Sequence, residues 1–190
     1  MNSSDRKRFG AIVCELNCTT AETVALQNCS VSGSIVIENP NVEVPEANKN
    51  NYGYVTAGSL IGVLSGGEVI DCVNYASFTV KQVASLGNTI ALYPSFGGVI
   101  GCALSITLDD ATETTAATVI TDKLTNLENR GEIKYEDNAK SFIYRPVVGG
   151  ILGYTSTTAA TVMTNCDNFA NVSYNAIGTG TSGANTPVSV

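Results

Sequence analysis

The sequence predicts an all-β fold, a β-solenoid of about four degenerate repeats separated by variable loops. Three observations predict it: four ungapped ten-residue blocks, an apolar–polar alternation at the end of each block, and a composition without long helix-forming runs. The blocks cover residues 28–37, 71–80, 126–135 and 165–174. An alternating segment buries only one face, so it needs stacked copies of itself to build a continuous core.

Each block begins with Asn or Asp, carries Gly or Ala five positions later, and ends in an alternating strand. The first column contains Asn28, Asp71, Asn126 and Asn165. We expect an amide ladder there, at one corner of successive coils. The later Gly fits a corner with positive φ, although Ala76 and Ala170 show that this requirement is not absolute. A second, partial ladder is predicted for Asn74, Asn129 and Asn168, interrupted where Val31 stands. Rows of ligand-binding side chains are the alternative interpretation.

A Gly-rich strand precedes each block. The matching segments are 9–14, 58–63, 97–102 and 149–154. The Gly-Gly pairs at 97–98 and 149–150 predict a corner where backbones approach closely. Chain length varies only between the motifs, so loops are predicted at 38–53, 81–92, 105–118, 136–143 and 155–161. We therefore divide the chain into a flexible tail (1–8), a repeat domain (9–174) and a Gly/Ser/Thr-rich tail (175–190).

Five of the six cysteines fall into two repeat columns. One column contains Cys29, Cys72, Leu127 and Cys166, and the other contains Cys14, Val63, Cys102 and Tyr154. A column that exchanges Cys with Leu or Val is an apolar packing position, so we predict reduced core thiols. A Cys29–Cys72 disulfide between adjacent coils is the alternative. Cys18 lies outside both columns, and no CxxC pair indicates a zinc or redox motif.

Composition excludes several classes of function. The chain contains no His, which removes His-based triads, general bases and metal sites. Its net charge of −7 argues against nucleic acid, since phosphate binding needs clustered Lys and Arg, and the one basic cluster is Arg6-Lys7-Arg8. No segment approaches the roughly 18 consecutive apolar residues of a membrane helix, so direct membrane insertion is not expected. We predict no cofactor, no metal and no catalytic residue.

The densest acidic group in a loop is Asp109, Asp110 and Glu113. Such carboxylates bind Ca²⁺ or act as acid and base in polysaccharide cleavage, but no EF-hand spacing or partner basic cluster accompanies them. Solvated loop charge is therefore the favoured interpretation.

Tyrosines are the second candidate feature, and the sequence places them at two kinds of position. Tyr54, Tyr93 and Tyr144 precede the Gly-rich strands, whereas Tyr135 and Tyr174 end two of the blocks. An outer aromatic strip would pack against sugar rings. The period-two positions 135 and 174 instead predict side chains that face the core or cap its edge.

The motifs resemble GLUG-type repeats of bacterial surface proteins, which are abundant in gut Bacteroidetes. The resemblance is carried by 149–154 with 165–172 and by 97–101 with 126–133, and it covers roughly residues 9–174. The first copy departs from the pattern because Val13 and Val31 replace the expected Gly and Asn. The resemblance implies a right-handed parallel β-helix in a secreted or surface-anchored protein that acts in adhesion or as a spacer.

We therefore expect a non-enzymatic cell-surface module for adhesion or display, with a glycan or a host surface protein as partner. The alternatives are a carbohydrate-active β-helix, such as a polysaccharide lyase or hydrolase, and an inert spacer. An extracellular or cell-surface location is expected, with a signal peptide upstream of this segment. Self-association through the solenoid ends is also expected, because uncovered strand edges invite pairing. The sequence assigns no ligand-binding residue.

Overall fold

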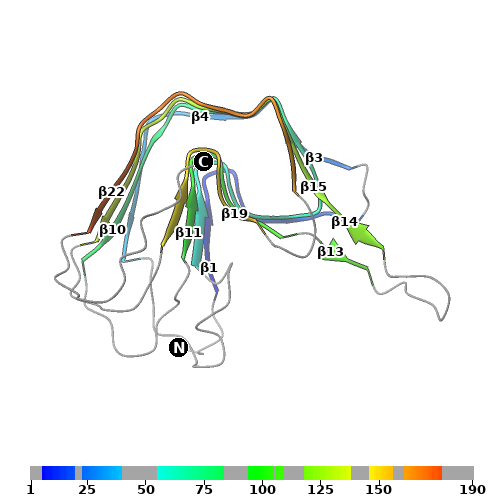
Figure 1. Cartoon of the computed structure of the whole chain (residues 1–190), viewed down its shortest axis with the longest axis horizontal. Helices are drawn as coiled ribbons and strands as arrows, with labels where there is room; N and C mark the ends of the chain where they lie inside the picture. The colour runs from blue at the N-terminus through cyan, green and yellow to red at the C-terminus, as the bar shows by residue number, and fades with distance from the viewer. Residues whose placement is uncertain are drawn as a thin grey trace.

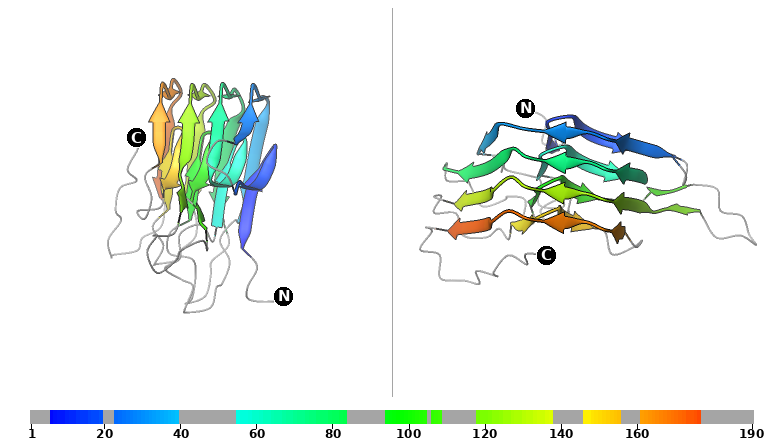
Figure 2. Two further views of the ribbon diagram at one scale, coloured as in Figure 1. Left: turned by 90° about the vertical axis from the view of Figure 1, so that its right-hand side faces the viewer. Right: turned by 90° about the horizontal axis from the view of Figure 1, so that it is seen from above.

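The computed structural model describes residues 6–19, 23–39, 55–83, 94–104, 106–108, 118–137, 146–155 and 161–176. Within these ranges the chain forms strands and turns and no helix. The strands stack as four successive rungs of a parallel β-helix (Figures 1 and 2). The predicted all-β solenoid of about four repeats is confirmed.

Each rung contributes one strand to each of five parallel sheets, which we number in chain order. Sheet one contains β1 (Lys7–Gly10), β6 (Val55–Gly58), β11 (Ser95–Gly97) and β18 (Val147–Gly149). Sheet two contains β2 (Val13–Asn17), β7 (Ile61–Ser65), β12 (Ile100–Ala103) and β19 (Leu152–Thr155). Sheet three contains β3 (Val24–Gln27), β8 (Gly67–Ile70), β15 (Asp122–Thr125) and β20 (Val162–Thr164).

The remaining strands complete each rung. Sheet four contains β4 (Ser30–Val31), β9 (Val73–Asn74), β16 (Glu128–Asn129) and β21 (Asp167–Asn168). Sheet five contains β5 (Ser34–Glu38), β10 (Ser77–Gln82), β17 (Ile133–Asp137) and β22 (Val172–Ala176). An antiparallel pair, β13 (Ile106–Thr107) with β14 (Val119–Ile120), extends the third rung between its sheet-two and sheet-three strands.

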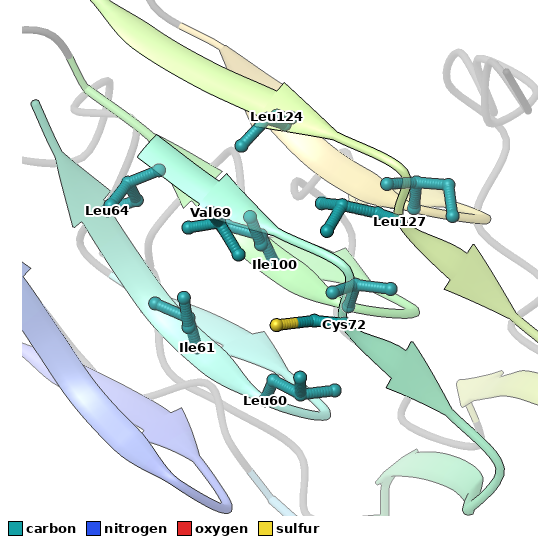
Figure 3. Close-up of a cluster of buried hydrophobic side chains, with 10 residues drawn as sticks. Leu60, Ile61, Leu64, Val69, Cys72, Ile100, Leu124 and Leu127 are labelled. Carbon is teal, nitrogen blue, oxygen red and sulfur yellow. The ribbon is translucent and has the colours of Figure 1, made fainter. Parts of the chain in front are cut away.

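Sheets one and two form a hairpin that lies inside an arch made by sheets three, four and five (Figure 1). This arrangement creates two hydrophobic cores. The first core lies between sheets one and five and contains Val55, Ala57, Phe78, Val80, Phe96, Ile133, Tyr135 and Val148. The second lies between sheet two and sheets three and four (Figure 3) and contains Leu60, Ile61, Leu64, Val69, Cys72, Val99, Ile100, Leu124, Leu127 and Ile151.

Glycine lies at the tip of the inner hairpin in every rung. A Cβ built on Gly58 would lie 2.6 Å from the amide nitrogen of Gly101 and from the carbonyl oxygen of Val99. A Cβ on Gly98 would lie 2.8 Å from Cγ of Asn129. The column of Gly58 therefore has no room for a side chain, which confirms the close approach predicted from the Gly-Gly pairs. In the column of Gly98, the second rung has the buried Ser59.

In the first rung, the alignment predicted from the sequence is wrong by one residue. Gly10 pairs with Gly58, one position later than the alignment predicts, because glycine is needed at the hairpin tip. The shift places Glu15 beside Val63. It leaves Cys14 exposed, so the prediction that Cys14 fills a core column is wrong.

The ordered rungs begin within the predicted N-terminal tail. Lys7 and Arg8 lie in β1, and β22 ends at Ala176, two residues beyond the predicted boundary of the repeat domain. Arg8 forms an ion pair with Glu15 between sheets one and two. The hydrogen bond from Arg8 lowers the pKa of the Glu15 carboxyl. In the first rung, an ion pair therefore joins the two strands of the inner hairpin.

The corner between sheets three and four uses a left-handed Asn or Asp in every rung. The φ angle is 55° at Asn28, 52° at Asp71, 54° at Asn126 and 51° at Asn165. Nδ2 of Asn126 donates to Oδ1 of Asp71 over 2.8 Å, and Nδ2 of Asn165 donates to Oδ1 of Asn126 over 3.2 Å. These bonds confirm the predicted corner ladder. Asn tolerates this conformation better than most residues, which explains the column.

At the corner between sheets four and five, the positive φ expected for Gly is confirmed at Gly33 and is wrong for Gly131. Only Gly33 adopts it there, at 105°, while Ala76, Gly131 and Ala170 do not. A Cβ on Gly131 would instead overlap the carbonyl oxygen of Ala76. The need for a small residue in this column comes from close packing of adjacent rungs.

A second amide ladder runs along the inside of sheet four. Nδ2 of Asn74 donates to Oδ1 of Asn129 over 2.7 Å, and Nδ2 of Asn129 donates to Oδ1 of Asn168 over 2.7 Å. Asn74 and Asn129 are completely buried. Val31 ends the ladder in the first rung, as predicted. Because the amides bond each other, the structural interpretation of this column is confirmed.

The cysteines are free thiols. Cys72 and Cys102 are buried, and Cys29 and Cys166 pack against the second core, which confirms reduced core thiols for these four. Burial raises the pKa of Cys102 to about 12. No disulfide joins Cys29 to Cys72. Cys18 is buried at the turn between sheets two and three.

Asp122 is a buried carboxylate at the start of β15, with none of its surface exposed. Oδ1 accepts a hydrogen bond from the amide of Gly66 over 2.6 Å, whereas Oδ2 has no partner among the described residues. Burial raises the pKa of Asp122 to about 6. The pKa of the Cys18 thiol is also raised, first by burial and then by the charge of Asp122.

The inner ladder predicts an unequal response to the same substitution. Asn129→Ala removes both ladder bonds from a buried position, so we expect it to destabilise the fold by about 2 to 4 kcal/mol. Asn168→Ala, at the exposed end of the ladder, should cost roughly 1 kcal/mol because water can replace the lost partner. Urea unfolding of the two variants measures the difference. Equal losses would contradict a role for the buried ladder.

Asp122 predicts that stability falls as pH rises. Its folded pKa of about 6 lies above the ordinary value of 3.8, so the folded state binds the extra proton between these values. Deprotonation should therefore remove about 2 to 3 kcal/mol of stability between about pH 4 and pH 6. Asp122→Asn should remove this loss and be more stable than the wild type at neutral pH. Parallel pH profiles of urea unfolding for the two proteins would refute the prediction.

Candidate functional site

The backbone bends at a convex corner between sheets four and five (Figure 1). Exposed side chains of successive rungs form a ridge along this corner. Its central column follows the inner ladder by one residue and contains Tyr75, Arg130 and Phe169. Successive side chains of a strand point to opposite faces, so the buried amides send these three outward. Tyr75 is 53% exposed and Phe169 is 61% exposed, which is unusual for large aromatic side chains.

The ridge is held together by charge. The guanidinium of Arg130 lies over the ring of Phe169, with its Cζ atom 4.7 Å from the ring centroid. Nε of Arg130 donates to Oε2 of Glu128 over 2.6 Å. This hydrogen bond raises the pKa of Arg130. The ion pair holds Arg130 to Glu128 in its own rung, and the cation–π contact holds it to Phe169 in the next rung.

A second column of the ridge lies on sheet four itself. Val73, Glu128 and Asp167 are in register there, each two residues before a member of the central column. In the first rung the two columns contain Ser30 and Ser32. We call Tyr75, Arg130, Phe169, Glu128 and Asp167 the corner ridge. It presents two aromatic rings, one guanidinium and two carboxylates on the last three rungs.

The chemistry of the corner ridge suits recognition of a protein. Aromatic residues and Arg are enriched at the energetic centres of protein interfaces. Small-molecule sites are typically concave, whereas this surface is a convex corner. The ridge is also preorganised, because backbone pairing on adjacent rungs fixes the spacing of its side chains.

Among the described residues, no three His, Cys, Asp or Glu side chains are grouped so that they could hold a metal ion. Nor does any helix in these ranges have the length and apolar character needed to cross a membrane. The acidic group at Asp109, Asp110 and Glu113 lies outside the described residues.

The structure separates the predicted tyrosines. Tyr135 is completely buried, and Tyr174 packs against the first core, which confirms the prediction for these two. The centroid of the Tyr135 ring lies 5.3 Å from that of Tyr174 and 5.4 Å from that of Phe96. The other three tyrosines, Tyr54, Tyr93 and Tyr144, lie outside the described residues.

The exposed aromatic residues are ones that sequence reasoning missed. Tyr75, Arg130 and Phe169 occupy the fifth position of three blocks, directly after a column of Asn. Once that Asn is predicted to point inward, the period of two predicts that the next residue points outward. The period of two therefore predicts these exposed residues once the side chains of the Asn column are known to point inward.

The corner ridge predicts that its residues contribute little to folding. Arg130 is exposed and Phe169 lies outside both cores, so Arg130→Gln should change the free energy of unfolding by less than about 1 kcal/mol. Removing the guanidinium should nevertheless release the Phe169 ring, which NMR relaxation of the ring would detect. A loss of several kcal/mol in urea unfolding would assign Arg130 a structural role instead.

The repeat and the corner ridge are the features that related proteins would share with this chain. Comparison with models of protein families, with curated proteins and with solved structures gives no match. The function therefore has to be inferred from the repeat motifs and from the chemistry of the described surface.

Proposed function

We propose that this chain is a non-enzymatic solenoid module of a bacterial cell-surface protein, and that it binds a protein partner through the corner ridge. The observation that carries the proposal is the exposed row of Tyr75, Arg130 and Phe169 on three successive rungs. The resemblance of the repeats to GLUG-type repeats of gut Bacteroidetes supports the surface setting. A host surface protein is the partner that fits an adhesive role.

Protein is favoured over glycan by the shape and the charge of the ridge. One side of the Phe169 ring is already covered by Arg130, which leaves less of that ring for stacking on a sugar. Glu128 and Arg130 neutralise each other, so the ridge suits an interface with mixed polar and aromatic contacts. The uncharged faces of Tyr75 and Phe169 supply the apolar anchors that interface centres require.

An extracellular location also agrees with the state of the thiols. Thiolate is the form that reacts in disulfide exchange. Burial raises the pKa of the Cys72 and Cys102 thiols, and because both side chains lie in the core they stay protonated and inaccessible to oxidants. Free cysteines in the core are therefore compatible with an oxidising environment.

Binding experiments with matched variants test the proposal. The protein would be screened against a panel of host surface and matrix proteins and against a glycan array. Tyr75→Ser and Phe169→Ser should each weaken protein binding by roughly 30-fold or more, since interface anchors contribute about 2 kcal/mol or more. Val36→Ser is the control, because Val36 is 52% exposed on the outer side of sheet five, away from the ridge.

Other outcomes would assign other functions. Glycan hits that disappear in the ridge variants would make the module a lectin-like surface. Release of unsaturated sugars from polysaccharides would make it a lyase and overturn the non-enzymatic proposal. If partner binding survives both ridge substitutions, the corner ridge is not the surface that binds the partner.

A further inference from the structure

The fourth rung lies at one end of the described stack of rungs. Strands β18 to β22 pair with the third rung on one side, and no described strand pairs with them on the other. A cavity of about 290 Å³ opens on this face. Its lining is mostly apolar and includes Ile151, Leu152, Tyr154, Met163 and Cys166. Met163 is 44% exposed, although its column partner Leu124 is completely buried.

A further rung stacked on the fourth would fill this cavity. In the inner rungs, the side chains of the next rung cover the same columns and close the second core. A rung that fits this face needs aliphatic residues in the columns of Leu152 and Met163 and a small or apolar residue in the column of Cys166. It also needs five parallel strands whose backbone amides and carbonyls pair with those of the fourth rung.

The first rung has this composition and is itself uncovered on its outer side. Its strands β1 to β5 pair only with the second rung in the described structure. Following the register from rung to rung, Val13 shares the column of Leu152, Leu26 that of Met163, and Cys29 that of Cys166. In the first core, Ile35 and Ile37 share the columns of Val172 and Tyr174.

We propose that the first rung of a second copy of this chain docks on the fourth rung, so that copies stack head to tail. The occupant is a second copy because its first rung continues the columns in register. The same two faces remain open at the ends of such a pair. Since the contact is heterologous and requires no rotation that closes a ring, stacking can continue into a filament. This inference stands independently of the corner ridge.

The polar columns are compatible with the junction. In the corner ladder, each amide donates to the preceding rung, as Asn165 does to Asn126, so Asn28 of the next copy can donate to Oδ1 of Asn165. The inner ladder ends satisfied, because Nδ2 of Asn168 donates to the carbonyl of Ala170. The second hydrogen of this Nδ2, which Asn74 and Asn129 donate to the next rung, meets Val31 at the junction, so docking loses one amide hydrogen bond there.

The charged column of the first rung is also compatible with docking. Arg8 and Glu15 share the columns of Val147 and Tyr154. Since these two charges pair with each other, covering them would not bury a lone charge.

A native pair of thiols tests the orientation of the junction. Head-to-tail stacking places Cys166 of one copy beside Cys29 of the next, whereas within one chain they are three rungs, or about 14 Å, apart and too far for a disulfide. Mild oxidation by copper phenanthroline, which accepts the two thiol electrons, should therefore yield a Cys29–Cys166 disulfide between chains. Mass spectrometry of mixed isotope-labelled and unlabelled protein identifies it. Cys166→Ser should abolish this product, and Cys14→Ser should leave it unchanged.

An electrostatic swap tests the register of the junction. Val24 and Val162 share one column and are 47% and 49% exposed, so charges are tolerated there in the single chain. The pair Val24→Lys with Val162→Lys should weaken association about fivefold, and Val24→Lys with Val162→Glu should restore it. Sedimentation velocity over a concentration series measures both, with Thr79→Lys on the outer face of β10 as control.

Three results would overturn the proposal. The first is a protein that stays monomeric at every concentration, also where hydrogen exchange shows that residues 177–190 cover the fourth rung. The second is a disulfide between chains that joins Cys166 only to Cys166. The third is equal association of the Lys–Lys and the Lys–Glu variants.

Discussion

In-register parallel pairing between rungs is the interaction on which the rest of this structure depends. It places equivalent residues of successive rungs about 4.8 Å apart, so every side chain packs against its own column partners. Apolar columns then form continuous cores, as Phe78, Ile133 and Val172 do on sheet five. A buried polar column must supply both donor and acceptor to itself, which an amide does and a carboxylate does not. The inner column of Asn satisfies this condition.

The same constraint connects the scaffold to its exposed surface. Asn74, Asn129 and Asn168 must point inward to bond one another, and each strand then directs its next residue to solvent. The corner ridge is therefore positioned by the ladder beneath it. Asp122 departs from this pattern, because it is buried in a column where the amide of Gly66 is its one hydrogen-bond donor among the described residues. Its raised pKa is the electrostatic consequence.

Much of the fold could be predicted because the motifs repeat without gaps. The two Asn columns, the core cysteines and the inward Tyr135 all follow from comparing blocks with one another. The errors arose where one rung departs from the others. Phe9-Gly10-Ala11 allows two ungapped alignments, and only the steric demand at the hairpin tip selects Gly10. Positive φ was assigned to the Gly column, although Asn at the preceding corner meets that requirement and bonds its neighbours.

The sequence by itself determined the number of rungs, the residues that share each column and the alternation that separates core from solvent. These are local or repeated properties, and a period of two together with internal alignment is enough to establish them. Only the tertiary structure decided that sheets one and two fold inside the arch of the other three. It also decided that the corner ridge is exposed and that, among the described residues, no further strand pairs with the first or the fourth rung on its outer side. Which sheets face each other depends on packing between distant segments, and no periodicity within a segment records that choice.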